Sequence, residues 1–179
     1  MLNWLKKKLL NKYIADKKGI RSKKITSLQQ TVSIGIICTI DSEDAYKDIF
    51  SIFSALQQNN KTVRLVGYID SKAVPFYCLT QLTADYFCQK DLNWYGKPTV
   101  VQVYDFMDMD FDMLIDFSHG QYSPLQLICQ LSKAKFITGS NPYHTDLYDL
   151  HISGDVMDNR SLLNTIDKYS RNLIGEKYE

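Results

Sequence analysis

The sequence lacks the long apolar runs and the targeting segment that would place it in or across a membrane. No stretch approaches the roughly 18 consecutive apolar residues that a membrane-spanning helix needs. The first residues, MLNWLKKKLLNKY, have neither the continuous apolar segment nor the small-residue cleavage site of a secretory signal peptide. These absences predict a cytoplasmic protein, with a peripheral position at the inner face of the membrane as the alternative.

Closely spaced cysteines and glycine-rich loops are missing as well. The four cysteines are scattered through the chain, with no CxxC pair and no histidine at a metal-ligand spacing. We therefore expect reduced, buried thiols and no bound metal ion. The sequence also has no GxGxxG or P-loop pattern that could cradle a phosphate, so we expect no cofactor.

The charge that is present is distributed unevenly. Residues 1–30 contain nine lysines and arginines and one acidic residue, a net charge of +8, whereas residues 31–179 contain 12 basic and 19 acidic residues, a net charge of −7. Such asymmetry indicates contact with something anionic, or folding of the basic part onto its own acidic domain. We expect a basic arm of residues 1–30 and one α/β domain of residues 31–179, and the choice between these two roles of the arm stays open.

The arm begins with a pattern typical of an amphipathic helix. Apolar residues recur at every third or fourth position, and Gly19 ends the helix. The predicted apolar stripe consists of Leu2, Trp4, Leu5, Leu9, Tyr13 and Ile14. The residues expected to contact an anionic partner are Lys6, Lys7, Lys8, Lys12, Lys17, Lys18, Arg21, Lys23 and Lys24. Lysines beside an apolar stripe are also often simply solvated.

From residue 31 onward the pattern changes to that of an α/β domain. An almost continuous apolar run at 32–40 predicts a central strand that is covered on both faces. The segment 43–56 predicts a helix capped by Asp41 or Ser42. Since 63–69 predicts a second strand, the three elements form a βαβ unit with parallel pairing.

The remaining elements follow from similar patterns. We expect helices at 79–89, 125–132 and 161–172 and strands at 99–104, 113–117, 135–139 and 147–152. Ser123 is expected as the N-cap of the helix at 125–132, and Pro124 as its first helical position. Together these patterns predict a Rossmann-like three-layer α/β domain with a mostly parallel sheet, preceded by a basic amphipathic helix.

Candidate site residues lie in the loops that follow the strands, because ligands of open parallel sheets bind beyond the carboxyl ends of the strands. These residues are Asp41, Ser42, Asp116, Ser118, His119, Gly139, Asn141 and His144. Among them Asp116, Ser118 and His119 are the candidates for catalysis, since they place an acid, a hydroxyl and an imidazole before a helix N-terminus that could receive an anion. The same residues serve equally well as ordinary loop and capping residues.

Two resemblances can be named on particular segments. The segment FDMLIDF at 111–117, the helix start Ser123-Pro124 and the segment LSKAKFITG at 131–139 resemble the N-terminal Rossmann-like half of heptosyltransferase-type glycosyltransferases. That resemblance implies a sugar-transferring enzyme, but this sequence lacks the family's Gly-Asp after the first strand and its second, nucleotide-sugar-binding domain. The whole chain, including NWYGKP at 93–98, is similar to an uncharacterised family of short bacterial α/β proteins with a basic N-terminal helix, which implies no activity.

From these patterns we expect a non-catalytic binding or adaptor protein whose basic arm contacts RNA, the ribosome or an acidic protein surface. In one alternative, Leu2, Trp4, Leu5 and Leu9 enter the interface of an anionic membrane, which makes the chain a peripheral membrane protein. In the other, the strand-end loops form the site of a small-ligand-binding protein or a glycosyltransferase-like enzyme.

Overall fold

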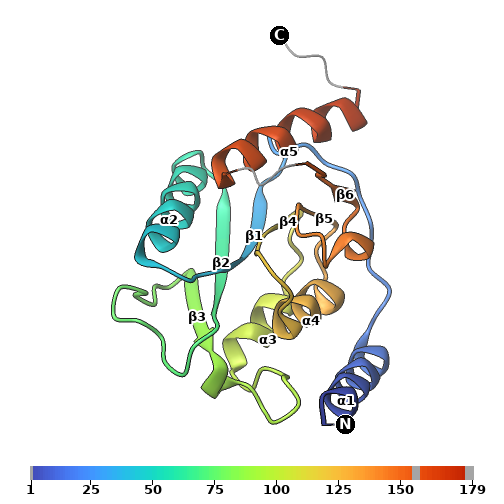
Figure 1. Cartoon of the computed structure of the whole chain (residues 1–179). Coiled ribbons are helices and arrows are strands. Elements are labelled where there is room, and N and C mark those ends of the chain that lie inside the picture. The colour runs from blue at the N-terminus through green and yellow to red at the C-terminus, as the bar shows by residue number, and fades with distance from the viewer. Residues whose placement is uncertain (1, 155–157, 176–179) are drawn as a thin grey trace.

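In the computed structural model, which describes residues 2–154 and 158–175, six parallel strands form one sheet (Figure 1). The strands are β1 (Ser33–Thr39), β2 (Thr62–Ile69), β3 (Ala84–Cys88), β4 (Met113–Phe117), β5 (Phe136–Gly139) and β6 (Leu150–His151). They lie in the order β3-β2-β1-β4-β5-β6, with every neighbouring pair parallel. This is the strand order of Rossmann sheets, so the predicted Rossmann-like fold is confirmed.

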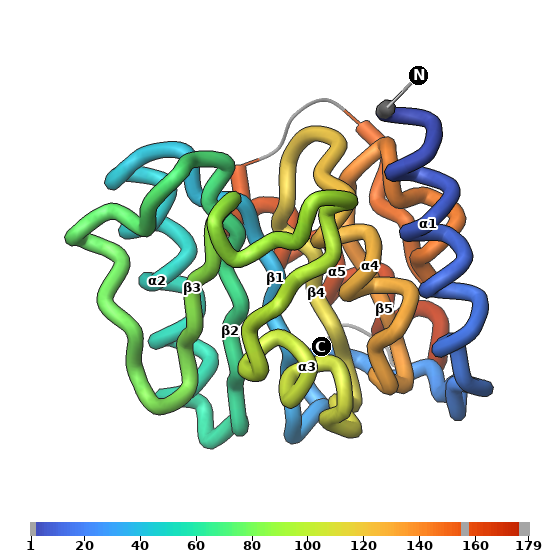
Figure 2. The backbone as a smooth tube through the Cα atoms, turned by 90° about the horizontal axis from the view of Figure 1, so that it is seen from below, coloured from blue at the N-terminus to red at the C-terminus, as the bar shows by residue number. Residues whose placement is uncertain are grey.

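Helices cover both faces of the sheet (Figures 1 and 2). They are α1 (Leu2–Lys17), α2 (Glu43–Gln58), α3 (Val101–Asp108), α4 (Ser123–Leu131) and α5 (Asn159–Leu173), with short 3-10 helices η1 (Gln89–Asp91) and η2 (Thr145–Leu147). α2 and α5 pack on one face, α3 and α4 pack on the other, and α1 packs against α4. In β1, Ile34 and Ile36 enter the first core while Ile37 enters the second, which explains the continuous apolar run in the sequence.

Two predicted elements between β2 and β4 are wrong. The segment 79–89, expected to be helical, contains β3, which pairs with β2 at the edge of the sheet. The segment 99–104, expected to be a strand because of its valines, contains the start of α3. Since β3 and β4 lie on opposite sides of β1, the chain must cross one face of the sheet, and α3 lies on that crossing with Val103 and Phe106 buried. Packing thus overrides the strand propensity of the valines.

The face of α1 that packs on the domain also differs from the predicted stripe. Leu10 and Ile14 are buried among residues of α3 and α4, whereas Trp4 and Leu5 are exposed. The side chain of Leu2 lies outside the described residues. Because apolar residues occur on more than one side of this helix, the sequence pattern fits several faces, and the position of α4 selects the one centred on Leu10 and Ile14.

The segment 18–32, which we call the strap, fastens the N-terminal arm to the domain. The guanidinium of Arg21 lies 2.6 Å from both carboxylate oxygens of Asp149, and the Lys23 ammonium lies 2.9 Å from one of them. Burial opposes ionisation of Asp149, but hydrogen bonds from the Ile137 N–H, Lys23 and Arg21 lower its pKa. The arm therefore docks on its own domain.

Asp112→Asn is expected to destabilise the fold at neutral pH and to have little effect near pH 2. The Asp112 carboxylate accepts hydrogen bonds from the N–H groups of Val32 and Ser33, both at 3.1 Å, and from the Lys135 ammonium at 2.7 Å. Burial alone would raise the pKa of Asp112, but these donors lower it to about 2. A carboxyl whose folded-state pKa lies below its unfolded value of about 3.9 stabilises the fold above that value and loses this contribution as the pH falls toward 2.

The expected loss at neutral pH is about 2 kcal/mol, measured by urea unfolding at both pH values. Asp110→Asn removes an exposed carboxyl nearby and serves as the control. A destabilisation by the Asp112 variant that persists unchanged near pH 2 would contradict the assignment.

Candidate functional site

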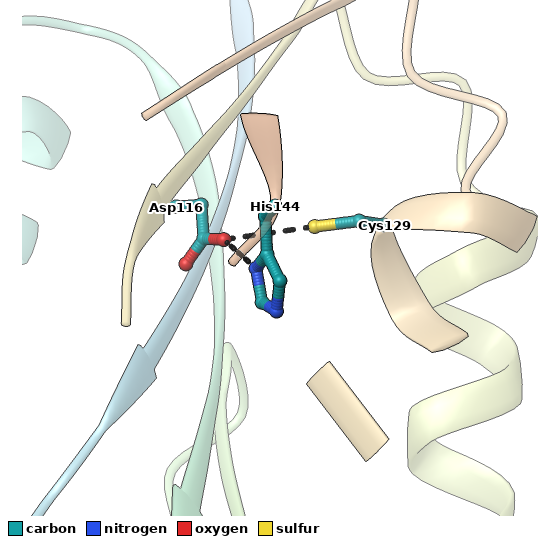
Figure 3. Close-up of side chains that lie close together, drawn as sticks. All are labelled: Asp116, Cys129 and His144. Carbon is teal, nitrogen blue, oxygen red and sulfur yellow. Dashed lines mark hydrogen bonds and ion pairs between the residues drawn. The ribbon is translucent and has the colours of Figure 1, made fainter. Parts of the chain in front are cut away.

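A cluster of buried polar side chains lies where β4 and β5 end (Figure 3). Asp116 belongs to β4, Cys129 to α4, and His144 precedes η2. Their donor atoms lie within 4.8 Å of one another. Exposed fractions are 0% for Asp116, 2% for Cys129 and 1% for His144. Three segments that are distant in the sequence therefore bring an acid, a thiol and an imidazole together in the interior.

The Asp116 carboxylate is the centre of this cluster. One oxygen accepts a hydrogen bond from the Ser118 N–H at 2.7 Å. The other lies 2.7 Å from the Tyr148 hydroxyl, 2.8 Å from Nδ1 of His144 and 3.8 Å from the Cys129 sulfur. Since a buried carboxylate is costly unless it is fully hydrogen-bonded, these neighbours account for an acid in a central strand.

The protonation of the neighbours follows from their surroundings. Burial, together with the negative charge of Asp116, raises the pKa values of the Cys129 thiol and the Tyr148 hydroxyl far above neutrality. Both groups therefore keep their protons and donate to Asp116. The same carboxylate fixes the His144 ring so that Nδ1 points to it, while Nε2 is buried and has no partner among the described residues. Cys129 is thus a hydrogen-bond donor and not a nucleophilic thiolate.

A second set of hydrogen bonds joins the loops around the cluster. The Asn141 amide donates to the Ser118 hydroxyl and to the Gly120 carbonyl, each at 2.9 Å. Its own oxygen accepts from the Tyr143 N–H at 3.0 Å. The loop after β4 and the loop after β5 are therefore held to one another by side chains that lie in the interior.

The structure brings together some of the predicted site residues and separates others. Asp116, Ser118, Asn141 and His144 are buried in the cluster, and Gly139 lies against Asp116. The other three predicted residues, Asp41, Ser42 and His119, are exposed. The imidazole beside Asp116 is consequently that of His144, and the His119 side chain lies at the surface.

Two members of the cluster were missed from the sequence. Cys129 was expected only as a structural thiol, and the cysteines of the described chain are indeed free and buried. Tyr148 carried no signal, because nothing in its neighbourhood along the chain distinguishes it from other tyrosines. The hydrogen bonds that these residues form with Asp116 join positions 13 apart for Cys129 and 32 apart for Tyr148, so local sequence patterns cannot indicate them.

The residue types Asp116, Cys129 and His144 could hold a zinc ion, but their spacing is that of a hydrogen-bonded network. Bonds of about 2.0–2.3 Å to a tetrahedral zinc ion place neighbouring ligand atoms roughly 3.3 Å apart or more. Nδ1 of His144 and the Asp116 oxygen are only 2.8 Å apart, a hydrogen-bond distance. The same oxygen is also bonded by Tyr148. The geometry of this cluster is therefore that of a hydrogen-bonded network and does not favour a zinc ion.

The crevice where Rossmann proteins bind phosphate groups is occupied by local contacts. Here the His119 N–H donates to the Thr39 hydroxyl across the ends of β1 and β4, at 3.1 Å. Ser42 caps α2, and Glu43 and Asp44 lie in its first turn, where they occupy the positive end of the helix dipole. The α2 N-terminus is therefore unsuited to an anionic ligand.

The predicted N-cap of α4 is wrong. Ser123 is the first residue of this helix, and the N-cap is Tyr122.

A cavity of about 930 Å³ lies between the strap and the end of α4. Two of its basic residues, Lys133 and Lys135, are paired with Asp108 and Asp112, respectively. Six basic and three acidic side chains line it, and Lys17 and Lys18 form no ion pair with a carboxylate in residues 2–154 or 158–175. The lining therefore carries an excess of positive charge.

Comparison with known proteins places the chain in a family without assigning an activity. Residues 3–173 match a family whose description reads "Family of unknown function (DUF6913)". No curated protein matches the chain. The match agrees with the predicted resemblance to an uncharacterised family, whereas the resemblance to heptosyltransferase-type enzymes stays a prediction.

Proposed function

Since the chain belongs to the family DUF6913, whose function is unknown, we propose a function from its own residues: a non-catalytic binding or adaptor protein whose docked basic segment contacts RNA, free or within the ribosome. The observation that carries this proposal is a set of exposed lysines held in place on the docked arm. They are Lys7, Lys8, Lys12, Lys17, Lys18 and Lys24, which we call the basic surface.

The basic surface retains its positive charge because its lysines are not neutralised within the chain. None of them forms an ion pair with a carboxylate in residues 2–154 or 158–175. Arg21 and Lys23, which were predicted to join the contact, are engaged by Asp149 instead. Docking through Leu10 and Ile14 fixes the helix, so the lysines meet a partner without the cost of ordering the helix.

Contact with RNA is favoured over insertion into a membrane surface. A membrane-bound amphipathic helix buries its apolar face among lipids, whereas α1 uses Leu10 and Ile14 to pack on its own domain. Leu9, which was predicted to enter a membrane, is half-buried. Trp4 and Leu5 are the exposed members of that predicted set among the side chains that the structure describes. No helix in the described part of the chain is long and apolar enough to cross a bilayer.

A binding role is also favoured over catalysis. Of the three candidates for catalysis, Asp116 and Ser118 are 0% and 1% exposed, whereas His119 is exposed and its side chain is not part of the cluster. A substrate needs contact with a general acid or base within hydrogen-bond distance. The cluster instead joins the loops of the sheet to one another, and sugar transfer, implied by the glycosyltransferase resemblance, gains no support from it.

Replacing Lys7, Lys8 and Lys12 together by glutamine is expected to weaken RNA binding by roughly tenfold or more at low salt. Each lysine that neutralises a phosphate releases a counterion, so the slope of log affinity against log salt is expected to fall by about 2. The measurement is fluorescence anisotropy of labelled RNA with the full chain over a salt series.

The matched control carries Lys72→Gln, Lys90→Gln and Lys168→Gln, which remove the same charge from exposed positions outside the arm. Equal loss in both variants would show that only net charge matters and would overturn the role of α1. Binding to anionic vesicles without binding to RNA would overturn this proposal and support the alternative of a peripheral membrane protein.

A further inference from the structure

Both tryptophans of the chain lie in solvent. Trp4 is 66% exposed and Trp94 is 57% exposed, and the sequence contains no other tryptophan. Tryptophan is highly buried on average, because its large ring gains much from leaving water. Two exposed tryptophan rings therefore call for a functional explanation.

Trp94 is held outward by a closed turn. The Asn93 side-chain oxygen accepts hydrogen bonds from the N–H groups of Tyr95 at 3.1 Å and Lys97 at 3.0 Å, and the Asn93 N–H donates to the Lys97 carbonyl at 2.8 Å. Gly96 has a φ of +91°, which a side chain would disfavour. The turn is therefore fixed by hydrogen bonds within it, two of which the Asn93 side chain accepts.

This turn lies beside the docked arm. The Lys97 ammonium sits 4.4 Å from the ring centroid of Tyr13 in α1 and 5.7 Å from that of Tyr104 in α3. Figure 2 shows the segment before α3 approaching α1 across the same side of the sheet. Trp4 lies within α1 itself, with the Lys8 ammonium 5.0 Å from its ring. Aromatic rings and cations are thus interleaved over α1 and the turn 93–97.

We propose that this surface binds single-stranded nucleic acid, with Trp94 and Trp4 stacking on unpaired bases while the basic surface contacts the phosphates. The inference rests on the proposed function and names its substrate class. Lysines alone would serve a duplex equally well, but exposed aromatic faces act on bases only where these are unstacked. The Lys8 ammonium beside the Trp4 ring supplies a positive charge for the phosphate backbone next to a stacked base.

Trp94→Ala is expected to weaken binding of a labelled single-stranded oligouridylate by roughly tenfold, with little change for an RNA duplex. Trp94→Phe keeps an aromatic face and is expected to retain most of the affinity. In a Trp4→Phe chain Trp94 is the remaining tryptophan, and its emission is expected to be quenched on addition of the oligouridylate. The matched control is Phe76→Ala, which removes an aromatic ring that is 88% exposed on the loop between β2 and β3.

The outcomes separate the two proposals. If the unaltered chain binds the oligouridylate and Trp94→Ala binds it equally well, stacking is overturned while the proposed function stands. Equal weakening toward single strand and duplex would also overturn stacking. An unaltered chain that binds neither RNA at low salt overturns both proposals.

Discussion

Replacing Asp116 by asparagine is expected to destabilise the fold by about 3 kcal/mol, because several buried groups lose the carboxylate that accepts their hydrogen bonds. The carboxylate accepts from the Ser118 N–H, the Tyr148 hydroxyl and the Cys129 thiol, and it holds Nδ1 of His144. Asparagine has one acceptor oxygen in place of two. Its NH₂ group would face the N–H and O–H donors that now bind the second carboxylate oxygen. At least one buried donor is then left without a partner, which costs about 1–3 kcal/mol by itself.

Urea unfolding followed by circular dichroism measures this loss. Asp105→Asn changes an exposed aspartate in the same way and is expected to alter the free energy of unfolding by less than about 0.5 kcal/mol. A small domain has only about 5–15 kcal/mol of stability, so the Asp116 variant should unfold at a much lower urea concentration. A shift no larger than that of the control would show that the cluster contributes little to the fold.

Gly139→Ala is expected to destabilise the fold by about 1–3 kcal/mol through steric overlap. A Cβ atom at this position would lie 2.7 Å from the backbone oxygen of Asp116, 2.9 Å from its Cβ and 2.9 Å from Cζ of Tyr148. The nearest atom is backbone in the middle of the sheet, so the strain spreads into the pairing of β4 with β5 and into the hydrogen bond between Tyr148 and Asp116.

The comparison is with Gly19→Ala, since no atom lies within 4 Å of a Cβ built at Gly19. Thermal unfolding of both variants distinguishes steric overlap from the general effect of removing a glycine. Equal midpoints for the two variants would contradict the close packing at the end of β5.

Much of the fold could be predicted because local patterns and long-range packing agree there. The apolar run of β1, the capped helix α2 and the strand β2 follow one another with short connections, so their parallel arrangement follows from the sequence. The region around α3 was misjudged because its valines favour a strand locally, while the crossing from β3 to β4 requires a helix. The packed face of α1 depends on where α4 lies, which no local pattern contains.

The candidate site was predictable only in part for the same reason. Loops after β4 and β5 were expected to converge, and Asp116, Ser118, Asn141 and His144 do lie together. The contributions of Cys129 and Tyr148 depend on how α4 and η2 pack on the sheet. The position of the turn 93–97 beside α1 depends on the contact of Lys97 with the distant Tyr13, which no local pattern contains.

The pairing of Arg21 with Asp149 also sets an order of events during synthesis. These two residues are 128 positions apart, and the helix that α1 packs against, α4, begins at residue 123. Because a chain is made from its N-terminus, the first 17 residues are complete long before their docking surface exists. Until then the basic segment has no surface on its own domain to pack against.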